Sequence, residues 1–274
     1  MAYNDDGCIL PKLAIRFKVG HKMEIITFGV GRRLMRCASE LSLFSGECKY
    51  DRLILLPIPS TRDKVNVSGT ELSLREAVSS ADEGTLVAGY GLPKDICDEV
   101  IGRGASVYDA ERDEDFLEEN AVVTAHGTLG HILSNYSEDI ADLRIGIIGY
   151  GRIGAALLRL LLFIGADVRV YTTRSSVAES LGEMGVCCEV IYKGCDFAEN
   201  DLIINTAPAK IIDEKSVTEE LSGIEIIDLA SGKIFPSAPN VTKLASVPDK
   251  MYPETAGRIY AKYILRALSS GVKR

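Results

Sequence analysis

The chain has 274 residues, of which 46% are hydrophobic and 26% charged, and a formal charge of −8 at pH 7. This composition is typical of a globular protein with a sizeable core, and its acidity argues against a nucleic-acid binder, which normally has a basic face. No apolar run approaches the ~18–20 residues that span a bilayer. Two acidic residues precede the first lysine, which does not fit a signal peptide. We therefore expect a cytoplasmic protein.

The seven cysteines fit a reducing compartment. None forms a C-x-x-C pair, so the sequence predicts neither a zinc site nor a thiol-exchange motif. Cys187 and Cys188 lie in the apolar stretch VCCEVIY, where we interpret them as buried reduced thiols.

Short apolar runs alternate with helical patterns along the chain, which is typical of β-α-β units and parallel sheets. In the first half, strands are predicted at Met23–Phe28, Leu53–Leu56, Thr85–Ala88 and Ala105–Tyr108. In the second half, they are predicted at Arg144–Ile148, Val168–Tyr171, Cys188–Ile191, Leu202–Asn205, Glu225–Asp228 and Lys243–Ala245. Because these runs are nearly all apolar, we expect both faces of each sheet to be covered.

Two long helices are predicted outside the strand series. One spans Asp115–Ser137 between the two halves, and Pro253–Gly271 has the initial proline and final glycine of a helix frame. We expect two α/β lobes with a cleft between them. Residues 1–138, completed by 253–274, form the first lobe, and residues 139–252 form the second.

The most specific motif follows the strand at Arg144–Ile148. It is a G-x-G-x-x-G sequence: Gly149-Tyr150-Gly151-Arg152-Ile153-Gly154. A predicted helix and a second strand follow it, as in a dinucleotide-binding unit. Gly149 allows the turn, Gly151 lets a pyrophosphate approach the backbone, and Gly154 lets helix and strand pack closely. The complete β-α-β context disfavours the alternative, a glycine-rich turn without a ligand.

The choice of dinucleotide depends on the end of the second strand. An NAD site usually has a carboxylate there, about 20 residues after the glycines, on the ribose 2′-OH. The local sequence is instead Tyr171-Thr172-Thr173-Arg174-Ser175-Ser176. Arg174 can bind a 2′-phosphate, with Thr173 and Ser175 beside it, so NADP is favoured and NAD is less expected. The alternative is that Arg174 is a solvated loop charge.

Two later turns are expected beside the nicotinamide half, because ligands bind at the carboxyl ends of such strands. Asn205, Thr206 and Pro208 belong to the first turn, and Asp228-Leu229-Ala230-Ser231 ends the next strand. Ordinary turns without a ligand are the alternative.

Two dehydrogenase classes lack their catalytic groups in this sequence. A 2-hydroxyacid dehydrogenase needs a histidine beyond its nucleotide domain, and the three histidines here are His21, His126 and His131. The Tyr-x-x-x-Lys pair of short-chain dehydrogenases lies on a helix, whereas Tyr90 and Lys94 enclose Gly and Pro, which break a helix.

Six segments occur in the order of one known family. Over residues 50–270 the chain resembles the family of dipicolinate synthase A-type subunits, in LLPIPSTRDKVNVSG (55–69), NAVVTAHGTLGHIL (120–133), the glycine segment (149–176), IINTAP (203–208), IIDLAS (226–231) and YPETAGRIYAKYIL (252–265). The chain departs from the family pattern at His126, where Glu is usual, and after Ser231, where Pro-Gly-Gly is usual. It is therefore identified as a divergent member.

The resemblance implies an α/β fold of two doubly wound lobes joined by helices. The C-terminal lobe is then a Rossmann NAD(P)-binding domain, and the shorter N-terminal lobe is flavodoxin-like. It also implies an NADP-dependent oxidoreductase of sporulating bacteria that converts a dihydrodipicolinate-type ring dicarboxylate to dipicolinate by hydride transfer. A flavoprotein-like B-type subunit is the implied partner, and we expect a homo-oligomer.

A ring dicarboxylate needs cations or clustered donors for its carboxylates and an acid or base near the carbon that loses hydride. The loop after Leu53–Leu56 carries Ser60, Thr61 and Arg62, with Arg62 as the expected carboxylate clamp. His126 is the candidate acid/base. A surface arginine and a structural histidine are the alternatives.

Two other functions remain open. One is an NAD(P)-dependent oxidoreductase acting on another small carboxylate or an imine. The other is a non-catalytic NADP-binding subunit that acts with a partner.

Overall fold

The computed structural model describes residues 14–19, 23–191, 196–208, 211–212, 215–230 and 236–270. The chain divides into two compact units. Unit 1 contains the residues up to Asn120 and those from Tyr252 onward, and unit 2 contains Ala121–Met251. The first boundary thus falls before residue 138, where the sequence led us to expect it.

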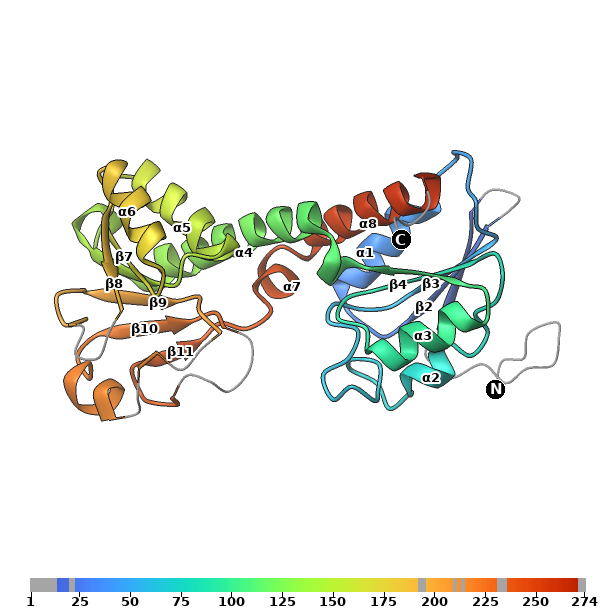
Figure 1. Ribbon diagram of the computed structural model, residues 1–274, viewed down its shortest axis with the longest axis horizontal. Coiled ribbons are helices and arrows are strands. Elements are labelled where there is room, and N and C mark those ends of the chain that lie inside the picture. The colour runs from blue at the N-terminus through green and yellow to red at the C-terminus, as the bar shows by residue number, and fades with distance from the viewer. Residues whose placement is uncertain are drawn as a thin grey trace. The chain divides into compact units, whose positions relative to one another are not determined.

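Unit 1 is built on a five-stranded sheet (Figure 1). Its strands lie in chain order: β1 (Ala14–Val19), β2 (Met23–Phe28), β3 (Arg52–Leu55), β4 (Thr85–Gly89) and β5 (Ser106–Asp109). β2 to β5 are parallel, while β1 pairs antiparallel with β2 at the edge. The carboxyl ends of β2 to β5 therefore share one edge of the sheet.

Helices cover both faces of this sheet. Buried side chains of α1 (Arg32–Ser42) and α8 (Pro253–Ser270) pack on one face, and those of α2 (Leu74–Ala77) and α3 (Lys94–Gly102) pack on the other. α1 and α8 lie side by side (Figure 1), where Gly257 has no room for a side chain against Arg36. Unit 1 is therefore doubly wound.

Unit 2 contains a six-stranded parallel sheet. Its strands are β6 (Arg144–Ile148), β7 (Asp167–Thr172), β8 (Cys187–Val190), β9 (Leu202–Asn205), β10 (Glu225–Asp228) and β11 (Val241–Lys243). They lie in the order β11-β10-β9-β6-β7-β8, all parallel. This is the strand order of the Rossmann fold, in which the ligand lies where the order reverses, at the carboxyl ends of β6 and β9.

The two faces of this second sheet are covered by separate apolar clusters. On one face, α5 (Arg152–Phe163), the end of α6 (Ser175–Glu183) and the later turns of α4 (Glu114–Asn135) bury their apolar side chains. The other cluster contains Tyr171, Phe197 and Val217. α7 (Val247–Met251) follows β11.

The structure confirms the expected fold class of two doubly wound α/β lobes, one of them Rossmann-like. Every predicted strand lies within two residues of an observed one at each end. The edge strand β1 and helices α1, α2, α3 and α6 were not predicted. Among the described helices, none has the length and apolar character needed to cross a membrane.

Candidate functional site

The glycine motif forms a tight connection between β6 and α5. Gly149 has φ +94°, a conformation that favours glycine, and its N–H donates to the Tyr171 carbonyl at 2.8 Å. Gly151 is the N-cap of α5, and no side chain caps the helix there. The first turn of α5 thus keeps backbone N–H groups available to an anion.

The three glycines differ in their surroundings. A Cβ on Gly154 would overlap the Gly149 carbonyl oxygen, so this glycine allows α5 to pack against the end of β6. A Cβ on Gly151 would meet nothing within 4 Å, and the residue is exposed. The tasks assigned to these two glycines from the sequence, close packing for Gly154 and an open approach at Gly151, agree with this geometry, and the loop fits a dinucleotide diphosphate.

Arg174 reaches back from the end of β7 to this loop. Its Nη2 donates to the Tyr150 carbonyl at 2.5 Å, and its backbone N–H donates to the Thr172 hydroxyl at 3.2 Å. Arg174 is the N-cap of α6, and it is exposed together with Thr173 and Ser175. The guanidinium is thus held beside the glycine loop, with its other nitrogens available to a ligand.

The turn after β9 uses its polar side chains in two ways. Asn205 is 1% exposed, its Nδ2 donates to Asp228 at 2.8 Å, and its Oδ1 accepts the Ala207 N–H at 3.2 Å. Its side chain therefore holds the turn and is not open to a cofactor. Thr206 faces the glycine loop, and Pro208 is exposed at the end of the turn.

Asp228 is the centre of a buried polar group at the same edge. The side chain is 1% exposed, and its Oδ1 also accepts the Ala230 N–H at 3.1 Å. Lys243, the last residue of β11, places its Nζ 3.4 Å from Asp228 Oδ2. Ser231, the fourth residue of the expected turn, lies outside the described residues.

In unit 1, the loop after β3 carries the expected substrate residues in unequal settings. Ser60 is 0% exposed, donates to the Pro57 carbonyl at 3.2 Å and accepts the Tyr90 N–H at 2.8 Å. Its hydroxyl therefore holds the loop, and the expected role as a donor to a ligand is wrong. Arg62 is exposed and makes no hydrogen bond or ion pair within the described residues.

Thr61 is engaged by its own loop. Its hydroxyl donates to Asp63 at 3.1 Å. The N–H groups of Asn66 and Val65 donate to the same carboxylate, and together these donors hold the pKa of Asp63 well below its usual range. Arg62 is therefore the most accessible of the three predicted loop residues.

His126 lies on α4 within unit 2 and is exposed, with no hydrogen-bond partner in the described part of the chain. We expected the adjacent Gly127 to allow a backbone or a ligand to approach. A Cβ on Gly127 would overlap Val247 and would lie 3.3 Å from the Met251 sulfur. Gly127 therefore allows α7 to pack on α4.

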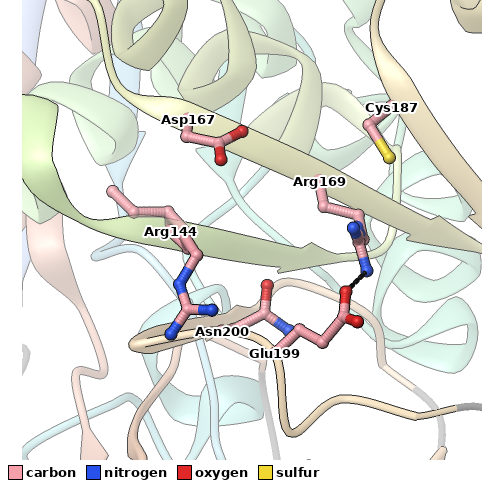
Figure 2. A pocket seen from close by; sticks show the side chains of 7 residues that line it. Arg144, Asp167, Arg169, Cys187, Glu199 and Asn200 are labelled. Atoms are coloured by element: carbon pink, nitrogen blue, oxygen red, sulfur yellow. Dashed lines mark hydrogen bonds and ion pairs between the residues drawn. The ribbon is translucent and has the colours of Figure 1, made fainter.

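Figure 2 shows a depression at the opposite edge of the unit 2 sheet, lined by residues at the amino ends of its strands. Arg144 binds Asp201 through two nitrogens, and Arg169 binds Glu199 at 2.6 Å. Because its arginines are paired with acids, this depression offers no unbalanced charge to a cofactor. Cys187 lines it and is exposed, so the expectation of a buried thiol is wrong at this residue.

Two contributors were not recognised in the sequence. Thr172 orients the backbone of Arg174, and Lys243 neutralises Asp228. The signal for both is their position as the last residue of a strand, which became certain only with the strand bounds. Within the described residues, no cluster of His, Cys, Asp and Glu side chains could hold a metal ion.

Comparison with known proteins first defines the class. Residues 117–238 match the family described as D-isomer specific 2-hydroxyacid dehydrogenase, NAD binding domain. This match covers unit 2 up to the end of the β10 turn and includes the glycine loop. Unit 2 is thus a nicotinamide-dinucleotide-binding domain of the kind found in oxidoreductases.

The particular resemblance is to the A-type subunit of dipicolinate synthase. That protein from Bacillus subtilis (strain 168) is 28% identical over 170 residues, which cover 58% of this chain and 56% of the relative. The crystal structure of its counterpart from Bacillus halodurans has a TM-score of 0.74 at 22% identity, covering 92% of this chain and 99% of that one. The Bacillus subtilis structure has a TM-score of 0.71 at 19% identity, covering 93% and 97%. The predicted resemblance, to a divergent relative, is confirmed.

Proposed function

We propose that this protein is an NADP-dependent oxidoreductase that oxidises a dihydrodipicolinate-type ring dicarboxylate to dipicolinate. The observation that carries the proposal is the glycine loop at the reversal point of a Rossmann sheet, with Arg174 held beside it. NADP⁺, when bound, supplies the hydride acceptor. Unit 2 is then the cofactor domain, and unit 1 contributes substrate-binding residues.

The preference for NADP rests on the end of β7. Residues 172–176 contain no carboxylate that could accept a ribose 2′-OH. Arg174 presents a planar, permanently charged group that matches phosphate oxygens. Its bond to the Tyr150 carbonyl uses one nitrogen, and holding the side chain in place lowers the entropy lost on binding.

On the substrate side, we propose roles for Arg62 and His126. Arg62 is an exposed guanidinium at the carboxyl edge of the unit 1 sheet and suits a carboxylate of the substrate. His126 is an exposed imidazole that can take the proton released when the ring is oxidised. Ser60 is omitted because its hydroxyl is buried and bonded within its loop.

A partner is proposed from the relatives' name, since a protein named as one lettered subunit of a synthase implies a second one. A flavoprotein-like B-type subunit is the candidate. Copurification of this chain with such a partner, compared with the chain alone, tests whether activity needs the partner.

The proposed reaction is tested by following NADPH formation from NADP⁺ and a dihydrodipicolinate substrate. We expect His126→Ala to lower kcat by about 100-fold, the effect of losing a general base, with little change in NADP⁺ affinity. Arg62→Ala should mainly raise KM, because it removes a contact made in the ground state and the transition state. His131→Ala is the matched control, since His131 lies on the same helix and bonds to Asn135. Full activity in both the His126 and Arg62 variants would contradict these roles.

A further inference from the structure

Thr206 links the two strand ends that flank the reversal point of the unit 2 sheet. Its backbone N–H donates to the Ile148 carbonyl at 2.8 Å. Its hydroxyl lies 3.0 Å from the Ile148 carbonyl and 3.2 Å from the Gly149 carbonyl, within hydrogen-bond distance of both. A side chain that follows β9 thus holds the first peptide of the glycine loop that follows β6.

The hydroxyl occupies space that two glycines leave open. A Cβ on Gly149 would lie 2.9 Å from Thr206 Oγ1, and a Cβ on Gly154 would lie 3.2 Å from it. The outer glycines of the motif therefore serve this contact in addition to the turn and the packing of α5.

Holding the Gly149 carbonyl also fixes a donor. The peptide bond is planar, so the Gly149 C=O and the Tyr150 N–H point in opposite directions and move together. The next peptide is held in the same way, because Arg174 binds the Tyr150 carbonyl and so fixes the Gly151 N–H. Within the described residues, neither of these two N–H groups has a protein acceptor.

We infer that Thr206 is a positioning residue for the diphosphate: its hydroxyl fixes the Gly149–Tyr150 peptide and thereby aims the Tyr150 N–H at the ligand. This inference rests on the proposed dinucleotide site. Thr206 acts on the loop and makes no contact with the cofactor through its hydroxyl. Arg174 acts on the adjacent peptide in addition to its proposed contact with the 2′-phosphate.

The test separates the diphosphate from the rest of the ligand. Calorimetric titrations compare NADP⁺, NAD⁺ and adenosine 2′-monophosphate, which lacks the diphosphate, on wild type and on Thr206→Val, Thr206→Ser and Thr206→Ala. We expect Thr206→Val and Thr206→Ala to weaken dinucleotide binding by about 3- to 10-fold, the range that one hydrogen bond supplies. Thr206→Ser should bind nearly as wild type, and affinity for adenosine 2′-monophosphate should be unchanged throughout. Thr218→Val, at an exposed threonine on the π-helix Ser216–Glu220, is the control.

Each other outcome has a distinct meaning. Wild-type dinucleotide affinity in both Thr206→Val and Thr206→Ala overturns the inference. Equal weakening of NADP⁺ and adenosine 2′-monophosphate also overturns it, because the substitution then disturbs the whole domain. If the folded wild type binds neither dinucleotide, the proposed function itself fails, which is distinguishable from a failure of Thr206 alone.

Discussion

Gly151 and Gly154 belong to one motif but lack a side chain for different reasons. Gly151 faces open space and has a φ of −93°, which alanine adopts readily. Gly154 lies against the backbone of Gly149, which has little freedom to move because its N–H binds Tyr171. At this scale, one position serves the ligand and the other serves the fold.

Alanine at each position should therefore give opposite results. Gly151→Ala should unfold within about 0.5 kcal/mol of wild type, since its methyl group meets no protein atom, but should weaken NADP⁺ binding. Gly154→Ala should lower the free energy of unfolding by about 1–3 kcal/mol, because α5 must move. Urea denaturation and calorimetry on the two variants measure both effects. A stable Gly154→Ala variant with normal affinity would contradict the packing role.

Among the elements, α7 depends on a single small residue of α4. Gly127 is buried against Val247, the first residue of α7, and has no room for a methyl group. His126 is adjacent to this contact, so the packing of α7 fixes the part of α4 that carries the proposed acid/base.

Gly127→Ala should destabilise unit 2 by about 1–3 kcal/mol through overpacking against α7. Val247→Ala should create the missing space. In a double-mutant cycle, the two substitutions together should cost about 1 kcal/mol less than the sum of the single effects. Strictly additive costs, measured by urea denaturation, would mean that the two residues do not share this contact.

The elements also show what the sequence can predict. Strands such as Arg144–Ile148 and Leu202–Asn205 were predicted to the residue, because strands buried on both faces have apolar side chains throughout. β1, with the sequence AIRFKV, was missed because an antiparallel edge strand lacks such a continuous run.

The candidate site was predicted best where backbone requirements dictate the residue type. Glycines with restricted surroundings and an arginine in place of a carboxylate are visible in the letters. The role of Ser60 was not, because its hydroxyl is taken by Pro57 and Tyr90, two contacts that depend on the fold. The exposure of Cys187 likewise depends on its place at the start of β8.

At the scale of the whole molecule, acidic groups paired with bases set the stability at low pH. Arg144 lowers the pKa of Asp201 to about 2. A depressed carboxyl pKa stabilises the fold above the unfolded value of about 3.9, and this contribution is lost as pH falls toward 2. We expect Asp201→Asn to lower the thermal midpoint near pH 5 and to approach wild type near pH 2. A constant difference across this range would contradict the assignment.

The proposed NADP site is tested most directly by calorimetric titration of NADP⁺ and NAD⁺ into wild type and Arg174→Asp. Wild type should bind NADP⁺ more tightly than NAD⁺ by at least about 10-fold, since charge-assisted bonds to a phosphate contribute about 1.5–3 kcal/mol. Arg174→Asp should lose that preference or reverse it, because a carboxylate repels the 2′-phosphate and accepts a ribose hydroxyl. Equal affinity of wild type for both dinucleotides would contradict the role of Arg174, and binding of neither would contradict the dinucleotide site.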